Sequence, residues 1–419
     1  MEIHDYTDLT GWNLNQVSSK RSETQDMLVH ISNNYPYSTV HSCLANSLVE
    51  KGVEHQFVYS PLQRKTEANP AVQSHSSIKV ASPRIFNKFI RYLPLTKVLF
   101  SFLCFLWSLQ KHNIKPTFII AHNLWSDGMV AWLYHKLTGV RYTVAVRDSD
   151  INFFLPKLRP YHWLIRRVSR DAKRIIFINN AYVDRLKENY SHIPVEKAQV
   201  IYNGIIEDWL HLEVSPENDS SENDSSEKVS SEKNRPNNVC FVGAFIKRKN
   251  LKNTIQALSE LKKTVPDLTF TAIGGTEQEF LKCTGLTAKP NWITIVPRTG
   301  DRELIARHLR RARVFLMPSF TETFGLVYIE ALSQGCSLIH SKNEGIDGVF
   351  EERFVQRVDP HDVDDIRQKV ALLISNYPSG VPNAEIDRLI GNFSWEYIAE
   401  QYLEIITEEK LEWVNHMRS

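Results

Sequence analysis

The sequence has 419 residues, of which 42% are apolar and 23% charged, so the chain can bury a full core and suits two or three globular domains. Its five cysteines are scattered without a C-x-x-C pair, which excludes a cysteine metal motif and a disulfide framework and favours reduced thiols. The net charge of +2 hides an asymmetry: residues 1–200 hold 25 Lys and Arg against 15 Asp and Glu, and residues 201–419 hold 25 against 33. We therefore expect the two halves to have different surfaces and different partners.

The first half begins with a polar segment, residues 1–25, that lacks the charged-then-apolar design of a secretion signal, so a cytoplasmic protein is expected. Short apolar strands then alternate with helices, and the first predicted helix is at residues 40–51. The predicted strands are residues 27–31, 55–59, 118–121, 142–146 and 174–178. This alternation predicts a parallel α/β domain over residues 1–204.

A basic region lies inside this first domain. No Asp or Glu occurs from Ala68 to Ser126, where the basic residues are Lys79, Arg84, Lys88, Arg91, Lys97, Lys111 and Lys115. No nucleic-acid motif is visible, and the aromatic residues gather in or near the apolar run at residues 98–109, which favours an anionic membrane surface over nucleic acid. The run is too short to span a bilayer; it predicts either a buried core helix or a helix lying in one leaflet.

The polar stretch that follows predicts a domain boundary. Residues 215–238 include Glu-Asn-Asp-Ser-Ser twice and almost no apolar side chains, so we expect a flexible linker or insertion over residues 205–238. A second strand-helix series fills residues 239–394, and residues 395–419 have the apolar spacing of a terminal helix. The predicted strands here are residues 239–242, 268–273, 292–296, 314–317 and 337–340, with a helix at 362–375.

Polar residues follow two predicted strands of the first half. His122 comes directly after one strand and is either a cleft residue or a packed strand-end histidine. Arg147 and Asp150 follow the next strand. Arg147 could stabilise a leaving phosphate, or pair structurally with Asp148 or Asp150.

The first strand of the second half leads into a glycine and a basic cluster. Gly243 allows the backbone to approach a ligand closely, and Arg248 and Lys249 lie just before the next helix. Arg and Lys form strong charge-assisted hydrogen bonds to phosphate oxygens. The cluster therefore predicts a phosphate site, with a solvated basic turn as the alternative.

Two glutamates lie eight positions apart across a loop-to-helix junction, because residues 314–317 form a strand that Pro318 ends and helical spacing begins near Phe324. If the whole segment were helical, Glu322 and Glu330 would lie about 12 Å apart along the axis, more than the roughly 5 to 9.5 Å between the paired carboxylates of a glycosidase. They suit opposite ends of one elongated ligand. The new helix also points its free N–H groups at the loop.

This pattern resembles the donor-site signature of the retaining GT-B glycosyltransferases of family four. The resemblance implies two Rossmann-like domains facing across a cleft, with the terminal helix crossing back to the first. It implies that Glu322 lies beside the transferred sugar and Glu330 hydrogen-bonds the ribose, while Arg248 and Lys249 clamp the donor diphosphate. Donor-binding residues would be Gly243, Arg248, Lys249, Glu322, Thr323, Phe324, Gly325 and Glu330, and the catalytic residues Glu322, Arg248 and Lys249.

The sequence departs from the family at several positions. Asn250 stands where relatives often have glycine, Arg147 where many have histidine and Asp148 where many have glycine, and residues 32–37 lack the usual paired glycines. His122, Arg147 and Asp150 are accordingly assigned to the acceptor side of the cleft. Gly345 and Gly348 mark either a donor-closing loop or an ordinary turn.

The expected function is transfer of a sugar from a nucleotide diphosphate sugar to an acceptor hydroxyl in bacterial surface polysaccharide synthesis. No metal or other cofactor is expected beyond the nucleotide sugar as co-substrate, and no nucleic-acid partner. The acceptor would be a glycan or a polyprenyl-linked intermediate, used at the inner face of the plasma membrane. The alternatives are a GT-B sugar-nucleotide epimerase and a non-catalytic GT-B subunit that scaffolds a partner transferase.

Overall fold

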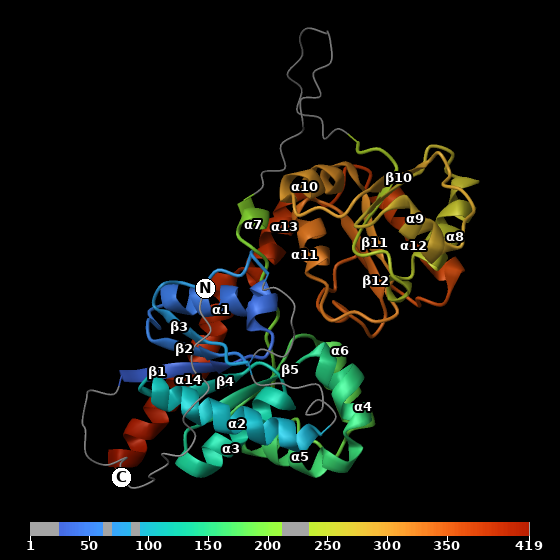
Figure 1. Cartoon of the computed structure of the whole chain (residues 1–419). Helices are drawn as coiled ribbons and strands as arrows, with labels where there is room; N and C mark the ends of the chain where they lie inside the picture. Colours follow the sequence, from blue (N-terminus) through green and yellow to red (C-terminus); the bar gives the residue numbers. More distant parts are fainter. Residues whose placement is uncertain (1–24, 62–68, 85–92, 212–233, 419) are drawn as a thin grey trace, which may run out of the picture.

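The computed structural model describes residues 25–61, 69–84, 93–211 and 234–418, and it has two parallel β-sheets (Figure 1). The first sheet has the strand order β3-β2-β1-β4-β5-β6-β7, and every pairing in it is parallel. Its strands are β1 (Gln25–Ile31), β2 (Gln56–Tyr59), β3 (Ile78–Ala81), β4 (Ile114–Ala121), β5 (Tyr142–Val146), β6 (Ile175–Phe177) and β7 (Ala198–Val200). The accompanying helices are α1 (Thr39–Glu50), α2 (Pro94–Lys111), α3 (Ser126–Thr138), α4 (Leu155–Lys157), α5 (His162–Asp171) and α6 (Asn180–Asn189).

The second sheet has the order β10-β9-β8-β11-β12-β13, again all parallel. Its strands are β8 (Asn238–Val242), β9 (Thr269–Ile273), β10 (Ile293–Val296), β11 (Val314–Met317), β12 (Ser337–Ser341) and β13 (Val355–Val358). The remaining helices are α7 (Asp208–His211), α8 (Leu251–Lys262), α9 (Glu277–Thr284), α10 (Arg302–Arg311), α11 (Leu326–Ser333), α12 (Val363–Asn376), α13 (Asn383–Ile390) and α14 (Trp395–Arg418). The α/β class and the two Rossmann-like sheets are confirmed.

Each sheet has a point at which the strand order reverses direction. In the first sheet it lies between β1 and β4, and in the second between β8 and β11. Parallel sheets bind ligands in the crevice beyond the carboxyl ends of the strands at such a point. The loops after β1, β4, β8 and β11 are therefore where the fold positions a site.

The C-terminal helix α14 returns to the first domain, as expected. Ile398, Tyr402 and Ile405 are buried against Leu44 of α1 and Phe118 of β4. At the surface, Lys51 forms ion pairs of 2.7 Å with Glu396 and Glu400. This packing ties the end of the chain to the domain where it began.

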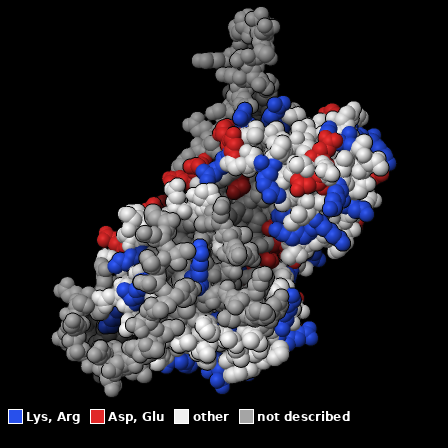
Figure 2. Space-filling view, in the orientation of Figure 1, with Lys and Arg blue, Asp and Glu red and all other residues white. Residues whose placement is uncertain are grey.

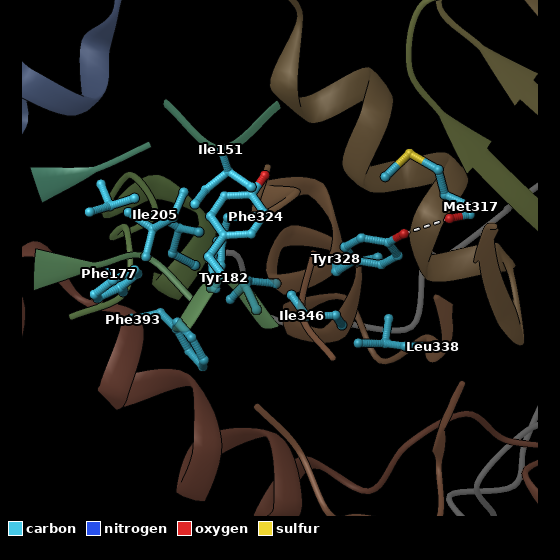
Figure 3. Close-up of a cluster of buried hydrophobic side chains, with 14 of the residues drawn as sticks. Ile151, Phe177, Tyr182, Ile205, Met317, Phe324, Tyr328, Leu338, Ile346 and Phe393 are labelled. Atoms are coloured by element: carbon cyan, nitrogen blue, oxygen red, sulfur yellow. Dashed lines mark hydrogen bonds between the residues drawn. The ribbon is translucent and has the colours of Figure 1, made fainter. Parts of the chain in front are cut away.

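A buried apolar seam joins the two domains (Figure 3). Phe324 stacks on Tyr202 with ring centroids 5.6 Å apart and lies 6.1 Å from Phe393. Tyr328 donates a hydrogen bond of 2.5 Å to the Met317 carbonyl oxygen, which fixes the start of α11 against the end of β11. The seam holds the loop that carries Glu322 close to the first domain.

The structure corrects two expectations about the elements. The sequence reading missed β3, β7 and β13, which are short strands at or near sheet edges with polar residues such as Lys79, Gln199 and Arg357. The predicted flexible segment, residues 205–238, is ordered at both ends, because Ile205 and Trp209 are buried and the Arg235 guanidinium donates hydrogen bonds to the Ala312 and Gln334 carbonyl oxygens. Residues 212–233 lie outside the described residues.

The apolar run at residues 98–109 lies within α2, which is neither fully buried nor fully exposed. Val98 and Phe105 are buried in the core, while the opposite side of the helix exposes Leu99, Leu103 and Trp107 by 44 to 53%. In the part of the chain that the structure describes, no helix is long and apolar enough to cross a membrane.

Candidate active site

The molecule is hollowed between its two lobes (Figure 2), and acidic atoms are visible inside the hollow. On the second-domain side, the loops after β8 and β11 meet here. The main-chain N–H of Phe320 donates to the Arg248 carbonyl oxygen at 2.8 Å, which joins the two loops directly. The predicted donor residues therefore come together at the reversal point of the second sheet.

A short turn after β8 presents the two basic residues. Residues Lys247–Lys249 form a single 3-10 turn, and Asn250 follows in the left-handed conformation with φ of 58°. Asparagine tolerates this conformation better than most residues, so the turn forms without a glycine at this position. Its Nδ2 also donates to the Pro318 and Pro360 carbonyl oxygens, which anchors the turn.

Lys249 and Glu322 form a buried ion pair. Lys249 is 8% exposed and Glu322 6%, and the lysine Nζ contacts Glu322 Oε2 directly. Burial lowers the pKa of Lys249, while the nearby Glu322 carboxylate raises it. Lys249 is therefore not the polar turn residue that the sequence suggested, because its charge is balanced inside the protein.

Arg248 differs from its neighbour, since its side chain is 48% exposed. Its Nη1 donates to the Thr321 carbonyl oxygen at 2.9 Å and lies 3.9 Å from Glu322 Oε2. The guanidinium thus lies at the mouth of the loop, with donors left over for a ligand.

The glycines here allow close backbone contacts. A Cβ on Gly274 would lie 2.3 Å from the Gly243 carbonyl oxygen, so the turns after β8 and β9 can touch only without that side chain. Gly325 has a φ of 77°, and a Cβ there would lie 2.7 Å from the Tyr328 ring. Gly325 is the N-cap of α11 and has no side-chain cap, so the first N–H groups of the helix remain available to an anion.

The other predicted donor residues have different surroundings. Thr323 donates its main-chain N–H to Glu322 Oε1 at 3.2 Å. The Phe324 side chain is buried in the seam and supports the loop by packing. Glu330 lies on α11, half-buried; among the described residues no side chain or main-chain group hydrogen-bonds its carboxyl group. Burial raises the pKa of Glu330 to about 7, opposed by Arg302.

The sequence reading missed residues that hold the Glu322 loop from outside. Glu344, 8% exposed, accepts the Glu322 main-chain N–H at 2.9 Å and pairs through its other oxygen with Arg185 of α6. Asn179 donates to the Thr323 carbonyl oxygen at 2.6 Å, and the Tyr182 hydroxyl contacts the Glu322 carbonyl oxygen at 3.2 Å. The sequence marked this region only by the glycines Gly345 and Gly348, and these did not indicate a role for Glu344.

On the first-domain side, His122 belongs to a buried histidine cluster. Its Nε2 lies 3.0 Å from His30 Nδ1, and the His41 ring packs edge-on at 4.5 Å. Burial lowers the pKa of all three rings, that of His30 to about 4. Gln56 fixes the outer end, because its Oε1 lies 2.9 Å from His30 Nε2.

Arg147 and Asp150 lie beside this cluster but do not pair with each other through side chains. The Arg147 guanidinium donates to Asn203 Oδ1 at 2.9 Å and to the His122 carbonyl oxygen at 3.4 Å. Asp150 accepts the main-chain N–H groups of Leu124, Trp125 and Arg147. Among the described residues Arg147 forms no ion pair with Asp148 or Asp150. Because Asp150 accepts main-chain N–H groups from the loops after β4 and β5, it holds these two loops together.

Asp127, which the sequence reading did not select, lies nearby at the start of α3. It is buried and accepts hydrogen bonds from Asn33 and Ser126. In the described ranges, no group of three or more His, Cys, Asp or Glu side chains is placed to hold a metal ion.

Comparison with known families divides the chain in the same two parts as the structure. The model described as "Glycosyl transferases group 1" matches residues 222–385, and "Glycosyltransferase Family 4" matches residues 39–209. Among curated proteins, the alpha-maltose-1-phosphate synthase of Mycolicibacterium smegmatis is 24% identical over 70% of this chain and 80% of its own length. The D-inositol 3-phosphate glycosyltransferase of Corynebacterium urealyticum is 23% identical over 71% of this chain and 72% of its own length.

Solved structures show the same fold at low identity. The sucrose-phosphate synthase of Thermosynechococcus elongatus superposes with a TM-score of 0.65 at 17% identity, covering 92% of this chain and 99% of that one. The lipopolysaccharide outer core galactosyltransferase WaaB also superposes with a TM-score of 0.65, at 14% identity, covering 92% of this chain and 100% of that one.

Proposed function

This chain belongs to the GT-B glycosyltransferases of family four, and from that premise we propose that it transfers a sugar from a nucleotide diphosphate sugar to an acceptor hydroxyl with retention at the anomeric carbon. The observation that carries the proposal is the convergence of Arg248, Lys249 and Glu322 at the reversal point of the second sheet, next to the free N-terminus of α11.

The charges at this point suit a diphosphate leaving group. Arg248 at the mouth and the N–H groups at the start of α11 are fixed donors, and such preorganised groups stabilise charge as it develops. Lys249 holds the Glu322 carboxylate in place until the donor arrives. Glu322 then positions the sugar, and Glu330 accepts from the ribose. In this proposal the nucleotide sugar is the only co-substrate and the protein cations replace a metal ion.

A nucleotide-sugar panel tests the donor assignment. UDP-, GDP-, ADP- and dTDP-sugars would be screened by thermal shift, where a ligand at 100 times its Kd stabilises by about 2.7 kcal/mol. The selected donor would be incubated with glycan and polyprenyl-linked acceptors, and the anomeric configuration of the product read by NMR. A product of inverted configuration would contradict retention. Isomerisation of the donor alone would favour an epimerase instead.

We also propose that the acceptor is used at the cytoplasmic face of a membrane, during synthesis of a bacterial surface polysaccharide. Supporting this, Leu95, Leu99, Leu103 and Trp107 of α2 recur every fourth residue and are 42 to 53% exposed, with Phe100 beside them at 46%. Residues at this spacing share one helix face. Lys111 continues the row, its Nζ 4.7 Å from the Trp107 ring centre. An apolar stripe bordered by cations and lacking acids suits an anionic lipid interface.

Sedimentation with phosphatidylglycerol vesicles tests the membrane role. The double variant Leu99→Glu and Leu103→Glu should lose at least about tenfold in binding, because two apolar anchors become charged. Leu372→Glu is the matched control, since Leu372 is 41% exposed on α12 of the other domain. If the α2 variant sediments as the wild type does, the stripe has another purpose. Of the basic residues predicted for this surface, Lys88 and Arg91 lie outside the described residues.

A further inference from the structure

A second depression lies on the first domain, and no residue of the Glu322 loop is in its lining. It has a volume of about 390 Å³, and its lining residues come from the segment after β5, from α5 and α6, and from the residues just after α6. Its polar lining consists of Arg159, His162, Arg185, Asn189, Tyr190 and His192, with no Asp or Glu. We call it the Arg159 pocket. Its composition suits an anion, because each lining polar side chain can donate a hydrogen bond.

The two histidines form an ordered chain of hydrogen bonds. His162 Nε2 lies 2.9 Å from the Leu155 carbonyl oxygen, and since a carbonyl only accepts, this nitrogen carries the proton. In the neutral ring His162 Nδ1 is then the acceptor, and His192 Nε2 donates to it at 2.9 Å. Protonation of His192 therefore adds one new N–H, at its Nδ1.

The two arginines still have donors to offer. The Arg159 side chain is exposed and forms no hydrogen bond or ion pair with any residue the structure describes. Arg185 uses Nη1 for Asn152 and Nη2 for Asn343 and Glu344, while its Nε–H has no acceptor among the described residues. Guanidinium groups match the oxygens of phosphate in two-point hydrogen bonds.

The pocket is linked to the active-site loop through Arg185, and exposed aromatic residues follow its lining residues in the chain. Arg185 lines it and also pairs with Glu344, whose other oxygen holds the Glu322 main-chain N–H. Phe153 and Trp163, which closely follow lining residues in the chain, are 49% and 55% exposed. Each has a cation over its ring, Lys157 at 3.9 Å and Arg167 at 5.2 Å. Amphipathic aromatics with basic neighbours are typical of the lipid headgroup level.

We propose that the Arg159 pocket binds the phosphate or diphosphate group of the acceptor, and so places the acceptor hydroxyl beside the sugar held at Glu322. This inference rests on the proposed sugar transfer. It adds a binding site on the first domain that is separate from the donor diphosphate site.

Titration with inorganic diphosphate tests the pocket directly. The readout is the imidazole NMR signals of His162 and His192, assigned with His162→Gln and His192→Gln, because these rings report only on this pocket and not on diphosphate bound at Arg248. We expect saturable shifts of both signals, weakened at least tenfold in Arg159→Ala and largely restored in Arg159→Lys. Lys187→Ala, which removes an exposed charge on α6 outside the lining, should bind within twofold of the wild type.

Two further probes separate the sources of the phosphate. Farnesyl diphosphate in phosphatidylcholine vesicles stands for a lipid-linked acceptor, and glucose 6-phosphate for a soluble one. The probe that shifts the histidine signals at the lower concentration identifies the class. If no probe moves either signal, or if Arg159→Ala binds as tightly as Lys187→Ala, the pocket assignment is wrong.

Failure of this inference can be told from failure of the proposed function. If sugar transfer occurs while diphosphate leaves both histidine signals unchanged, the proposed function is supported and the pocket assignment is wrong. If diphosphate binds as expected and no acceptor is glycosylated with any donor, the pocket is an anion site, and the proposed transfer and the acceptor role of the pocket are both wrong.

Discussion

Polar side chains are buried in different electrostatic states at the reversal points of the two sheets. At the second sheet, Lys249 and Glu322 are both buried as a direct ion pair, with Arg248 exposed beside them. At the first sheet, His30, His41 and His122 are buried with pKa values lowered by burial, so they are neutral near pH 7. Burial disfavours a charged side chain. At the second sheet the opposite charge of the ion-pair partner offsets this cost, and at the first sheet the histidine rings avoid it because they are neutral.

The difference teaches where charge is needed. A donor diphosphate brings negative charge, and a loop that already holds a cation, an exposed guanidinium and a free helix N-terminus can meet it. A hydroxyl acceptor brings none, and a neutral set of rings can pack beside it without repelling an ion. In our reading the phosphate of the acceptor is handled elsewhere, at the Arg159 pocket.

The largest effect should come from breaking the ion pair. Lys249→Ala leaves the Glu322 charge buried without its partner, which costs about 3 to 5 kcal/mol of unfolding free energy. Arg248→Ala should cost under about 1 kcal/mol in stability, since the side chain is half-exposed, yet weaken nucleotide diphosphate binding by about 1 to 3 kcal/mol. Denaturant unfolding and nucleotide titration measure both. Equal stability of the two variants would erase the contrast between the buried pair and the exposed arginine.

Next in size is the division of labour between the two glutamates. Glu322→Gln should lower kcat by about a hundredfold or more while nucleotide affinity is kept, because a group fixed against developing charge acts mainly in the transition state. Glu330→Gln should instead weaken nucleotide binding, by about 1 kcal/mol for one hydrogen bond. Steady-state kinetics and calorimetry separate the two; wild-type kcat in Glu322→Gln would place the reacting sugar elsewhere.

Glu344→Gln sharpens the comparison at the domain interface. The variant keeps an oxygen for the Glu322 N–H but loses the charge that pairs with Arg185, so the loop should be held less firmly when the domains meet. We expect kcat to fall about tenfold with donor KM nearly unchanged, the signature of a positioning residue. Glu352→Gln is the matched control, because Glu352 pairs with Arg388 inside the second domain. A fall of the same size in the control would show a general loss of stability.

The smallest effect concerns pH and Glu330. Burial raises the pKa of this carboxyl group in the folded protein to about 7, so between the unfolded value and about pH 7 the folded state holds more protons and stability falls as pH rises. Because the side chain remains partly exposed, the loss from pH 5 to pH 8 should be about 1 kcal/mol. Glu330→Gln should remove this slope, and the exposed Glu404→Gln should keep it. Thermal unfolding across this pH range is the measurement.

Much of the fold could be predicted from local pattern. The strands β1, β5, β8 and β11 are short apolar runs ended by turn residues, and such runs are identifiable without tertiary information. Edge strands were missed because β3 exposes two of its four residues and carries a lysine, so neither continuous apolarity nor length marks it. The apolar run in α2 was ambiguous for a related reason: hydrophobic residues all round a helix fit burial and a lipid face equally well.

The sequence by itself determined which chemistry is present: the basic turn after one strand, the glutamates across a loop-to-helix junction, and the alternation that brings strand ends to one edge. The tertiary structure alone decided the pairings. Lys249 meets Glu322 across 73 residues, and Arg185 meets Glu344 across 159, because strand order and the apolar seam bring those loops together. Residue type fixes what a side chain can do; the partner it finds depends on which strand ends become neighbours, and no local period in the chain encodes that.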